Sequence, residues 1–355
     1  MTTQARPGRS QSSTVPERCA AIRLISSLSL SSVAFGGGTV DCSVVIATYN
    51  RSQLLGDTLR ALCAQHVPAT FQWEMVVVDN NSSDATKETV RRVGETSSVP
   101  VRYEFEPRQG QSFARNSGID AAKGAVILFT DDDILPERDW VWKMHNALTT
   151  GPLDGVGGRV LLQREAPMPR WLSNRPDLLS WLALVEEDKP CLLEYPLLLT
   201  RRLVGASMGF RREVFEELGR FQTTLGHRGR RLYGEEEVEF IHRLLLKGKR
   251  IGYDPSVVVH HRIGAKRLRK SFFLRRHFYH ACGQARRLPS SNEAGILGVQ
   301  RWRYRHLLGS GWTALWQTCL RRPDAFSLQL GLALEAGTIW GTMTRRPEPP
   351  AGPTT

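Results

Sequence analysis

Three consecutive aspartates, Asp131, Asp132 and Asp133, follow the apolar run AVILF at 125–129 after a single threonine. Carboxylates this close repel one another, and a solvated turn needs only one of them as a cap. One interpretation is an acidic turn before a helix that begins near Pro136. The alternative is a cation site, because Mg²⁺ and Mn²⁺ take carboxylate oxygens together with substrate phosphates. The position at the end of an apolar strand favours the cation site.

A second acidic run, Glu235, Glu236 and Glu237, opens the amphipathic segment 235–249. The dipole of a helix stabilises acidic residues in its first turn, and this accounts for one or two of the three. One of them can also act as a general base that takes a proton from an attacking hydroxyl. The preceding segment, 225–234, contains Arg228, Arg230 and Arg231. These arginines indicate either a basic loop that closes over phosphates or a run of solvated charges.

Asp79 ends another apolar run, WEMVVVD at 73–79. A carboxylate at that place can accept a hydrogen bond from a nucleobase N–H or a ribose hydroxyl. A turn cap is nearly as good an explanation, because Asn80, Asn81 and Ser82 are ordinary turn formers.

Strands and helices that alternate along the chain must position these residues. Apolar runs rich in β-branched residues predict buried strands at 42–48, 73–79, 101–107 and 125–131. Helical periodicity predicts helices between them at 51–65, 83–93 and 112–123. This alternation predicts an α/β fold with a doubly wound, mostly parallel central sheet, in which ligands bind outside the carboxyl ends of the strands. Polar residues gather at those ends: Thr48, Tyr49, Asn50 and Arg51, then Asp79 and Asn80, then the aspartate triplet.

The second half of the chain is less regular. Residues 152–200 are expected to form loops and short helices that cover the site, and 203–221 a strand that runs into a helix. Residues 250–263 predict a closing pair of strands that contains His260 and His261. Because neighbouring strand residues point to opposite faces, at most one of these histidines faces the site. A lone histidine there is usually structural, but beside a carboxylate–metal site it becomes a candidate third ligand.

Composition narrows the class of protein. The 355 residues are 41% hydrophobic, which excludes global disorder, and the net charge of +13 suits nucleic acid, anionic lipid or phosphorylated small molecules. Basic residues with interleaved aromatics crowd 268–306, yet no nucleic-acid motif accompanies them, so an anionic membrane surface is expected rather than nucleic acid. Six cysteines without CxxC pairs argue against a structural zinc site and a disulfide framework, and favour a cytoplasmic protein.

The same features divide the chain into four parts. We expect a weakly ordered leader at 1–38, the α/β domain at 39–283, a basic, amphipathic and membrane-associated helical extension at 284–344, and a Pro-rich disordered tail at 345–355. Within the extension, the apolar segment 325–343 is nineteen residues long but contains Glu335. That favours a helix lying on a membrane interface over one that spans a bilayer.

These motifs together resemble the family 2 glycosyltransferases, inverting enzymes of GT-A fold that use nucleotide-activated sugars. The resemblance covers 42–283, and each motif alone is weak, whereas seven in order are specific. The matching stretches are SVVIATYNR, VVVDNNSSDAT, GQSFARNSGI, FTDDDILPERDWV, GASMGFRREVFEELGRF, EEEVEF and VVVHHRIGAKRL.

The resemblance implies roles for individual residues. The base would be Glu237 with Glu236 as its acidic partner, although the family usually has Asp there and the run leaves the register between the two open. The metal, Mg²⁺ or Mn²⁺, would be held by Asp131, Asp133 and His261, and the closing motif also aligns Arg262 and Arg267. The nucleoside-diphosphate sugar would be bound by Thr48, Tyr49, Asn50, Arg51, Asp79, Asn80, Arg115 and Asp132.

The resemblance also implies a type of reaction. The QxxRW element of processive synthases is absent, since 284–288 reads QARRL, so transfer of a single sugar is expected. The acceptor would be a saccharide or a lipid-linked molecule in glycan, exopolysaccharide or glycolipid assembly, at the inner face of the plasma membrane. The alternatives are a nucleotidyltransferase, whose Gly-rich phosphate loop is not matched by ATYNRSQLLG, and a non-catalytic nucleotide-sugar-binding protein.

Overall fold

The structure, a computed structural model, describes residues 40–194, 203–229, 231–287, 295–297, 299–322 and 324–344. The chain divides into two units, Met1–Ala34 and Phe35–Thr355, and the described residues belong to the second. The expected leader and tail lie outside the described residues, as do Arg230 and 195–202.

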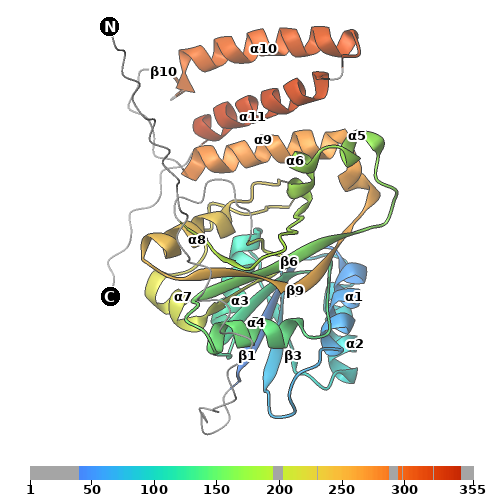
Figure 1. The fold of residues 1–355 in the computed structure, drawn as a ribbon, viewed down its shortest axis with the longest axis vertical. Helices are drawn as coiled ribbons and strands as arrows, with labels where there is room; N and C mark the ends of the chain where they lie inside the picture. The colour runs from blue at the N-terminus through green and yellow to red at the C-terminus, as the bar shows by residue number, and fades with distance from the viewer. Residues whose placement is uncertain are drawn as a thin grey trace, which may run out of the picture. The chain divides into compact units, whose positions relative to one another are not determined.

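Nine strands of the described residues form one central sheet (Figure 1). Its parallel half consists of β1 (Cys42–Thr48), β2 (Trp73–Asp79), β3 (Val101–Phe105) and β4 (Val126–Asp131). Its mixed half consists of β5 (Ile134–Pro136), β6 (Gly155–Arg164), β7 (Cys191–Leu192), β8 (Met208–Arg211) and β9 (Ile251–Ile263). The strand order is β3-β2-β1-β4-β8-β6-β9-β5, with β7 paired to β9. The predicted α/β fold with a central, mostly parallel sheet is confirmed.

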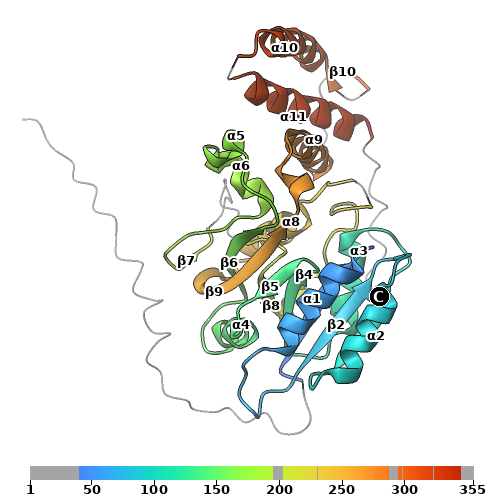
Figure 2. The same ribbon diagram turned by 90° about the vertical axis from the view of Figure 1, so that its right-hand side faces the viewer.

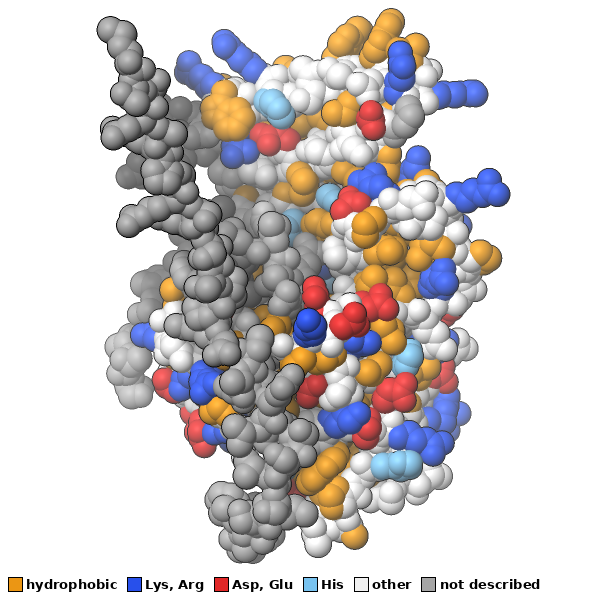
Figure 3. Space-filling view, viewed as in Figure 1, with side chains coloured by type: hydrophobic (Ala, Val, Ile, Leu, Met, Phe, Trp, Pro, Cys, Tyr) orange, Lys and Arg blue, Asp and Glu red, His pale blue; other side chains and the backbone are white. Residues whose placement is uncertain are grey.

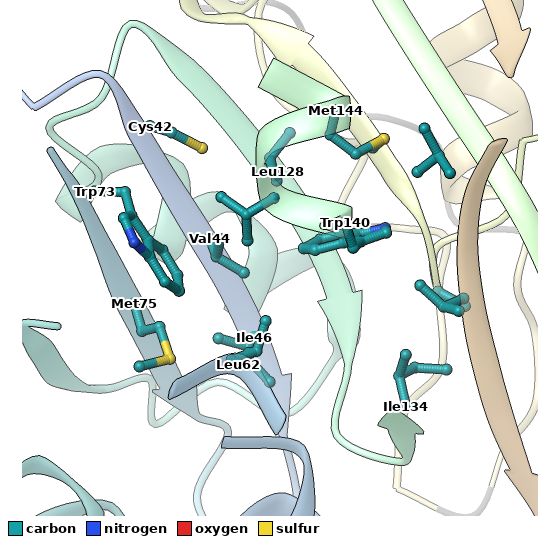
Figure 4. Packing of buried hydrophobic residues seen from close by; sticks show 14 of the residues in the cluster. Cys42, Val44, Ile46, Leu62, Trp73, Met75, Leu128, Ile134, Trp140 and Met144 are labelled. Carbon is teal, nitrogen blue, oxygen red and sulfur yellow. The ribbon is translucent and has the colours of Figure 1, made fainter. Parts of the chain in front are cut away.

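Helices cover both faces of this sheet because alternate strand residues point to opposite faces. Val44 and Ile46 of β1 pack against one face's helices, α1 (Ser52–Cys63), α2 (Thr86–Thr96) and α4 (Trp140–Thr149). Figure 4 shows Trp140 lying over Val44 and Leu128 in that cluster. Val45 faces the other layer, which contains α3 (Gln111–Ala121), α7 (Arg212–Leu218) and α8 (Glu236–Leu246).

Two expectations about the second half were wrong. Residues 250–263 form one long strand, β9, instead of a pair. Pro255 does not break this strand, because it lies where the register against β6 shifts and its missing backbone N–H is not needed for a hydrogen bond between the strands. The loops expected at 152–200 include the ten-residue strand β6. Its glycines disguise it, yet close packing requires them: a Cβ on Gly155 would lie 2.6 Å from the Phe210 ring. Short elements complete that part of the chain: α5 (Arg170–Ser173), α6 (Pro176–Leu179) and the 3₁₀ helix η3 (Ser180–Leu182).

Three long helices follow β9, and the second and third of them lie in the C-terminal extension expected at 284–344. They are α9 (Lys270–Arg287), α10 (Arg301–Cys319) and α11 (Ala325–Met343), with a 3₁₀ turn η4 (Ala265–Leu268) before them and the short strands β10 (Gly295–Ile296) and β11 (Val299–Gln300) between. Figures 1 and 2 show α11 lying between α9 and α10. Phe273 of α9 and Phe326 of α11 pack with Leu172 and Leu178, which ties this layer to the α/β domain. In the part of the chain that the structure describes, no helix is both long and apolar enough to cross a bilayer.

Alanine at Gly337 should push α11 away from α9. Its Cβ would lie 2.1 Å from the carbonyl oxygen of Phe278, and overpacking of this kind costs about 1–3 kcal/mol. The matched control is Gly331→Ala on the same helix, where a Cβ meets nothing within 4 Å. That control should be neutral or stabilising by up to about 1 kcal/mol, since alanine is the better helix former. Urea unfolding compares the two, and equal midpoints would contradict the close packing of these helices.

Candidate active site

A cavity of about 380 Å³ opens at the carboxyl ends of the parallel strands. Its volume lies within the range of small-molecule sites. The chain brings most of the predicted site residues to this cavity: Thr48, Tyr49, Arg51, Asn80, Arg115, Asp131, Asp132, Asp133, Glu236, Glu237 and His261. Asn50 and Asp79 do not line it.

Asp132 and Asp133 are buried at the cavity wall. Arg51 Nη1 donates to Asp132 Oδ1 at 2.8 Å and to Asp133 Oδ2 at 3.0 Å, and Thr48 Oγ1 donates to Asp132 Oδ2 at 2.8 Å. Burial raises the pKa of Asp132 to about 6 in spite of Arg51. Burial also opposes ionisation of Asp133, but the positive charge of Arg267 outweighs it and holds the pKa of Asp133 below its usual range. Asp133 is therefore the carboxylate of this pair that stays charged.

The triplet is not a helix cap. The next helix, α4, begins only at Trp140, and the acidic residues precede the short strand β5. The cap interpretation is therefore wrong: Asp131 ends β4, and Asp132 and Asp133 form the turn between β4 and β5.

His261 faces the same wall from β9. Its Nδ1 lies 2.9 Å from the carbonyl oxygen of Leu182, and Arg267 Nη1 lies 2.7 Å from its Nε2. This hydrogen-bond network assigns the proton to Nδ1 and leaves Nε2 as an acceptor. That Nε2 lies 3.4 Å from Asp133 Oδ1. His260 instead contacts Glu137 outside the cavity, as expected for the neighbouring strand residue.

The donor set fits a divalent cation only in part. Asp133 Oδ1 and His261 Nε2 lie 3.4 Å apart, and a carbonyl fixes the histidine tautomer, as is usual for metal ligands, but Nε2 already accepts from Arg267. Asp131 turns towards α3, where its Oδ1 lies 3.3 Å from Arg115 Nη2. Within the ranges described, no three His, Cys, Asp or Glu side chains are grouped to hold a metal. The roles of Asp131, Asp133 and His261 as metal ligands stay predictions.

Glu236 and Glu237 form the opposite acidic wall at the start of α8. Glu236 is buried, and its Oε1 accepts from Arg115 Nη1 at 2.9 Å. Burial and the neighbouring Glu237 raise the pKa of Glu236 to about 8, although Arg115 opposes them. Glu237 forms no ion pair with any described residue. Oε2 of Glu236 and Oε2 of Glu237 are both buried and have no hydrogen-bond partner among the described residues. Such oxygens can accept from the hydroxyl of a ligand.

Several cavity residues were not singled out from the sequence. Among the described cavity residues four are arginines, and Arg276 of α9 is the one with no carboxylate within 4 Å. It donates instead to the carbonyl oxygen of Leu232 at 3.1 Å. Burial lowers the pKa of His227 well below its usual value, so its ring is neutral. Trp181 of the short η3 helix stacks on His277 of α9 with ring centroids 4.0 Å apart. In the sequence, Arg276 lies in the basic run at 268–280, whose pattern indicates a membrane-contacting segment instead of a part of the site.

The polar residues after β2 organise the loops beside the cavity. Asp79 is buried and accepts hydrogen bonds at 2.8 Å both from the Ser82 amide and from the Tyr103 hydroxyl. Asn80 accepts from the Gly110 amide at 2.7 Å and so holds the start of α3. Asn50 has a left-handed φ of 52° and accepts from the Ser83 amide at 2.8 Å. Nucleoside contacts by these residues stay predictions.

Comparisons with known proteins bear on this site. Residues 43–219 match the family described as Glycosyl transferase family 2. Succinoglycan biosynthesis protein ExoM of Rhizobium meliloti is 25% identical over 241 residues, which are 68% of this chain and 72% of that protein. Glucosyl-dolichyl phosphate glucuronosyltransferase of Haloferax volcanii is 25% identical over 244 residues, 67% of this chain and 74% of that protein. Glycosyltransferase AglE of Haloferax volcanii is 34% identical, but the match spans only 33% of this chain and 38% of that protein.

A solved structure shares the fold. A mannosyltransferase from Pyrobaculum calidifontis in complex with GDP-Man and Mn²⁺ superposes with a TM-score of 0.56. It is 20% identical, and the superposition covers 84% of this chain and 87% of that one.

Glu236 should make the protein less stable as the pH rises. Its pKa in the folded chain, about 8, exceeds the ordinary 4.5, so the folded state binds the proton more tightly. The resulting stability is fully present below about pH 4 and is lost as the pH rises through about 8. We expect the free energy of unfolding to fall more steeply between those limits in the wild type than in Glu236→Gln, whose amide does not titrate.

Urea unfolding across this pH range measures the two slopes. The matched control is Glu239→Gln on the same helix, where Glu239 pairs with Arg243 at 3.0 Å outside the cavity. It should keep the wild-type slope. Parallel curves for wild type and Glu236→Gln would contradict the raised pKa.

Proposed function

This chain belongs to the family 2 glycosyltransferases through residues 43–219, and we propose that it transfers a single sugar from a nucleoside-diphosphate sugar to an acceptor hydroxyl with inversion. The observation that carries the proposal is the pair of acidic walls in one cavity, Asp133 with His261 on one side and Glu236 with Glu237 on the other. The mannosyltransferase that shares the fold was solved with a sugar nucleotide and Mn²⁺, which supports this class of donor. The family match also favours an enzyme over the nucleotidyltransferase and binding-protein alternatives.

Asp133 and His261 would hold the cation, Mg²⁺ or Mn²⁺. Asp133 stays ionised, and His261 keeps an unprotonated Nε2 beside it. When bound, the cation neutralises the negative charge that develops on a departing diphosphate. Arg51 and Arg267 border the same wall and add fixed positive charge there. Asp131 remains a predicted ligand, although its carboxylate contacts Arg115.

Glu237 is the proposed base. Two carboxyls side by side do not both ionise readily, and the raised pKa of Glu236 gives that residue the shared proton. Arg115 Nη1 also donates a hydrogen bond to Glu236 Oε1, whereas Oε2 of Glu237 has no partner among the described residues. Glu237 is therefore the one free to accept the proton of an acceptor hydroxyl. The hydroxyl oxygen then bonds to the anomeric carbon as the bond from that carbon to the diphosphate breaks.

The remaining roles follow from the position of the residues. The turn of Thr48, Tyr49, Asn50 and Arg51, with Asp79, Asn80 and Asp132, would contact the nucleoside and its phosphates, and Arg115 would support the pocket. The acceptor would be a saccharide or lipid-linked saccharide, in keeping with relatives named for succinoglycan biosynthesis and for a glucosyl-dolichyl phosphate. We propose a cytoplasmic enzyme at the inner face of the plasma membrane, without a role for nucleic acid.

Nucleotide binding should depend on both metal and Asp133. Calorimetric titration of UDP, GDP and dTDP in Mn²⁺ should show one of them binding the wild type most tightly. We expect Asp133→Asn to weaken that affinity about 10- to 100-fold, the usual effect of disturbing a metal site, and EDTA to do the same to the wild type. The control is Asp57→Asn, because Asp57 pairs with Arg60 and Arg262 away from the cavity. Wild-type affinity in Asp133→Asn, or indifference to EDTA, would overturn the metal assignment.

Glu237→Gln should abolish turnover without loss of nucleotide affinity. Removal of a general base costs about 10²- to 10⁴-fold in rate. Turnover is measured as release of nucleoside diphosphate from the sugar nucleotide that titration identifies, with water in place of the acceptor. Glu239→Gln is the matched control on the same helix and should keep its rate. Loss at Glu236→Gln with an active Glu237→Gln would move the base to Glu236, and full activity in both would contradict base catalysis here.

A further inference from the structure

The outer face of α10 carries large apolar side chains that the described residues leave uncovered. Leu308, Trp312, Leu315 and Trp316 are 76%, 71%, 58% and 61% exposed. Their spacing of four, three and one residues places them on one side of the helix. The opposite side faces α11, where Ala314 is buried. We call these four residues the apolar face of α10.

Positive charge surrounds this apolar face. Arg301 and Arg305 are exposed at the start of α10, and Arg321 and Arg322 are exposed just beyond its end. The helix itself contains no acidic residue. Figure 3 shows orange and blue side chains gathered over α10 at the top of the molecule. Tryptophan and leucine between arginines are typical of helices that lie in the interface of an anionic bilayer, with the arginines on lipid phosphates.

This assignment differs from the expectation for 325–343. That apolar segment is α11, the middle helix of the layer, and its Phe326, Leu330 and Ile339 are buried. Its Gly341 packs so closely on α9 that a Cβ would lie 2.7 Å from the Cys282 carbonyl oxygen. Its apolar surface is thus largely occupied by protein, whereas that of α10 faces outward.

We propose that the apolar face of α10 docks the chain on an anionic membrane surface. The four apolar side chains enter the headgroup region, and the arginines at both ends of the helix bind lipid phosphates. The overall charge of +13 attracts the protein to such a surface from a distance. The link to a lipid-linked acceptor rests on the proposed function, whereas the docking itself does not.

Docking through α10 would hold the cavity away from the lipid. Phe272 and Arg276 of α9 line the cavity, while Phe278 and Cys282 on the opposite side of α9 contact α11. Figures 1 and 2 place α10 beyond α11. Two helix spacings of about 8–10 Å each therefore separate α9 from α10. A membrane-anchored acceptor would have to present its hydroxyl well above the bilayer, on a chain of sugars.

Vesicle flotation of the full chain tests the proposal. We expect the wild type to float with phosphatidylcholine–phosphatidylglycerol vesicles, not with phosphatidylcholine alone, and to be released by high salt. Arg301→Gln/Arg305→Gln should weaken binding about tenfold or more, since each surface arginine contributes about 1 kcal/mol. Trp312→Ala/Trp316→Ala should weaken binding to a similar extent, because it removes apolar area that enters the headgroup region. The matched control, Arg60→Gln/Arg92→Gln, removes the same charge from exposed sites on α1 and α2 and should bind normally.

Two further measurements decide the orientation and separate the hypotheses. Brominated lipids should quench tryptophan fluorescence in the wild type, and Trp312→Phe/Trp316→Phe should lose that quenching. Quenching that persists in the variant, or flotation equal for all variants, would overturn docking through α10. A dimer in light scattering that Trp312→Ala/Trp316→Ala dissociates, without vesicle binding, would instead make this face an interface between two copies. Release of nucleoside diphosphate should be unchanged in the α10 variants, so failure of docking is distinguishable from failure of the transferase function.

Discussion

The site depends on one buried guanidinium. Arg115 is 3% exposed and contacts Glu236 at 2.9 Å and Asp131 at 3.3 Å. Asp131 ends β4 and Glu236 begins α8, so Arg115 of α3 links two elements that are far apart in the sequence. The backbone makes room for it: a Cβ on Gly205 would lie 2.0 Å from Arg115 Nη2. The two halves of the chain are thus joined at the site by charge as well as by the sheet.

The charged side chains that line the cavity do not all pair with one another. Three of the four described cavity arginines are paired with carboxylates of the same cavity, while Arg276 contacts carbonyl and imidazole groups and has no carboxylate within 4 Å in the described part of the chain. On the opposite acidic wall the outer oxygens of Glu236 and Glu237 have no donor among the described residues. The cavity therefore offers a guanidinium without a carboxylate partner and, on Glu237, a carboxylate oxygen without a donor among the described residues. A ligand that carries both negative charge and hydroxyl groups, as a sugar nucleotide and its acceptor do, complements both.

Local patterns predicted the parallel half of this fold well, because β-branched strands and amphipathic helices there are defined by short-range periodicity. The aspartate triplet at the end of β4 was found for the same reason. Contacts between residues far apart in the sequence could not be predicted from these local patterns. Arg115 contacts Glu236 across 121 residues, and Arg267 contacts Asp133 across 134. The strand β6 was missed because its glycines, needed for close packing, weaken the strand signal. The different partners within the triplet, Arg115 for Asp131 and Arg51 for Asp132 and Asp133, likewise involve residues that are distant in the sequence.

The helix α9 shows why the C-terminal layer belongs to the enzyme. The domain boundary expected at residue 283 falls inside this helix, which runs to Arg287. One side of α9 supplies Arg276 to the cavity and His280 to Glu235, which it contacts at 2.6 Å beside the proposed base. The other side supports α11 and, through it, α10. The basic extension that the sequence separates from the α/β domain therefore packs on a helix that also lines the cavity.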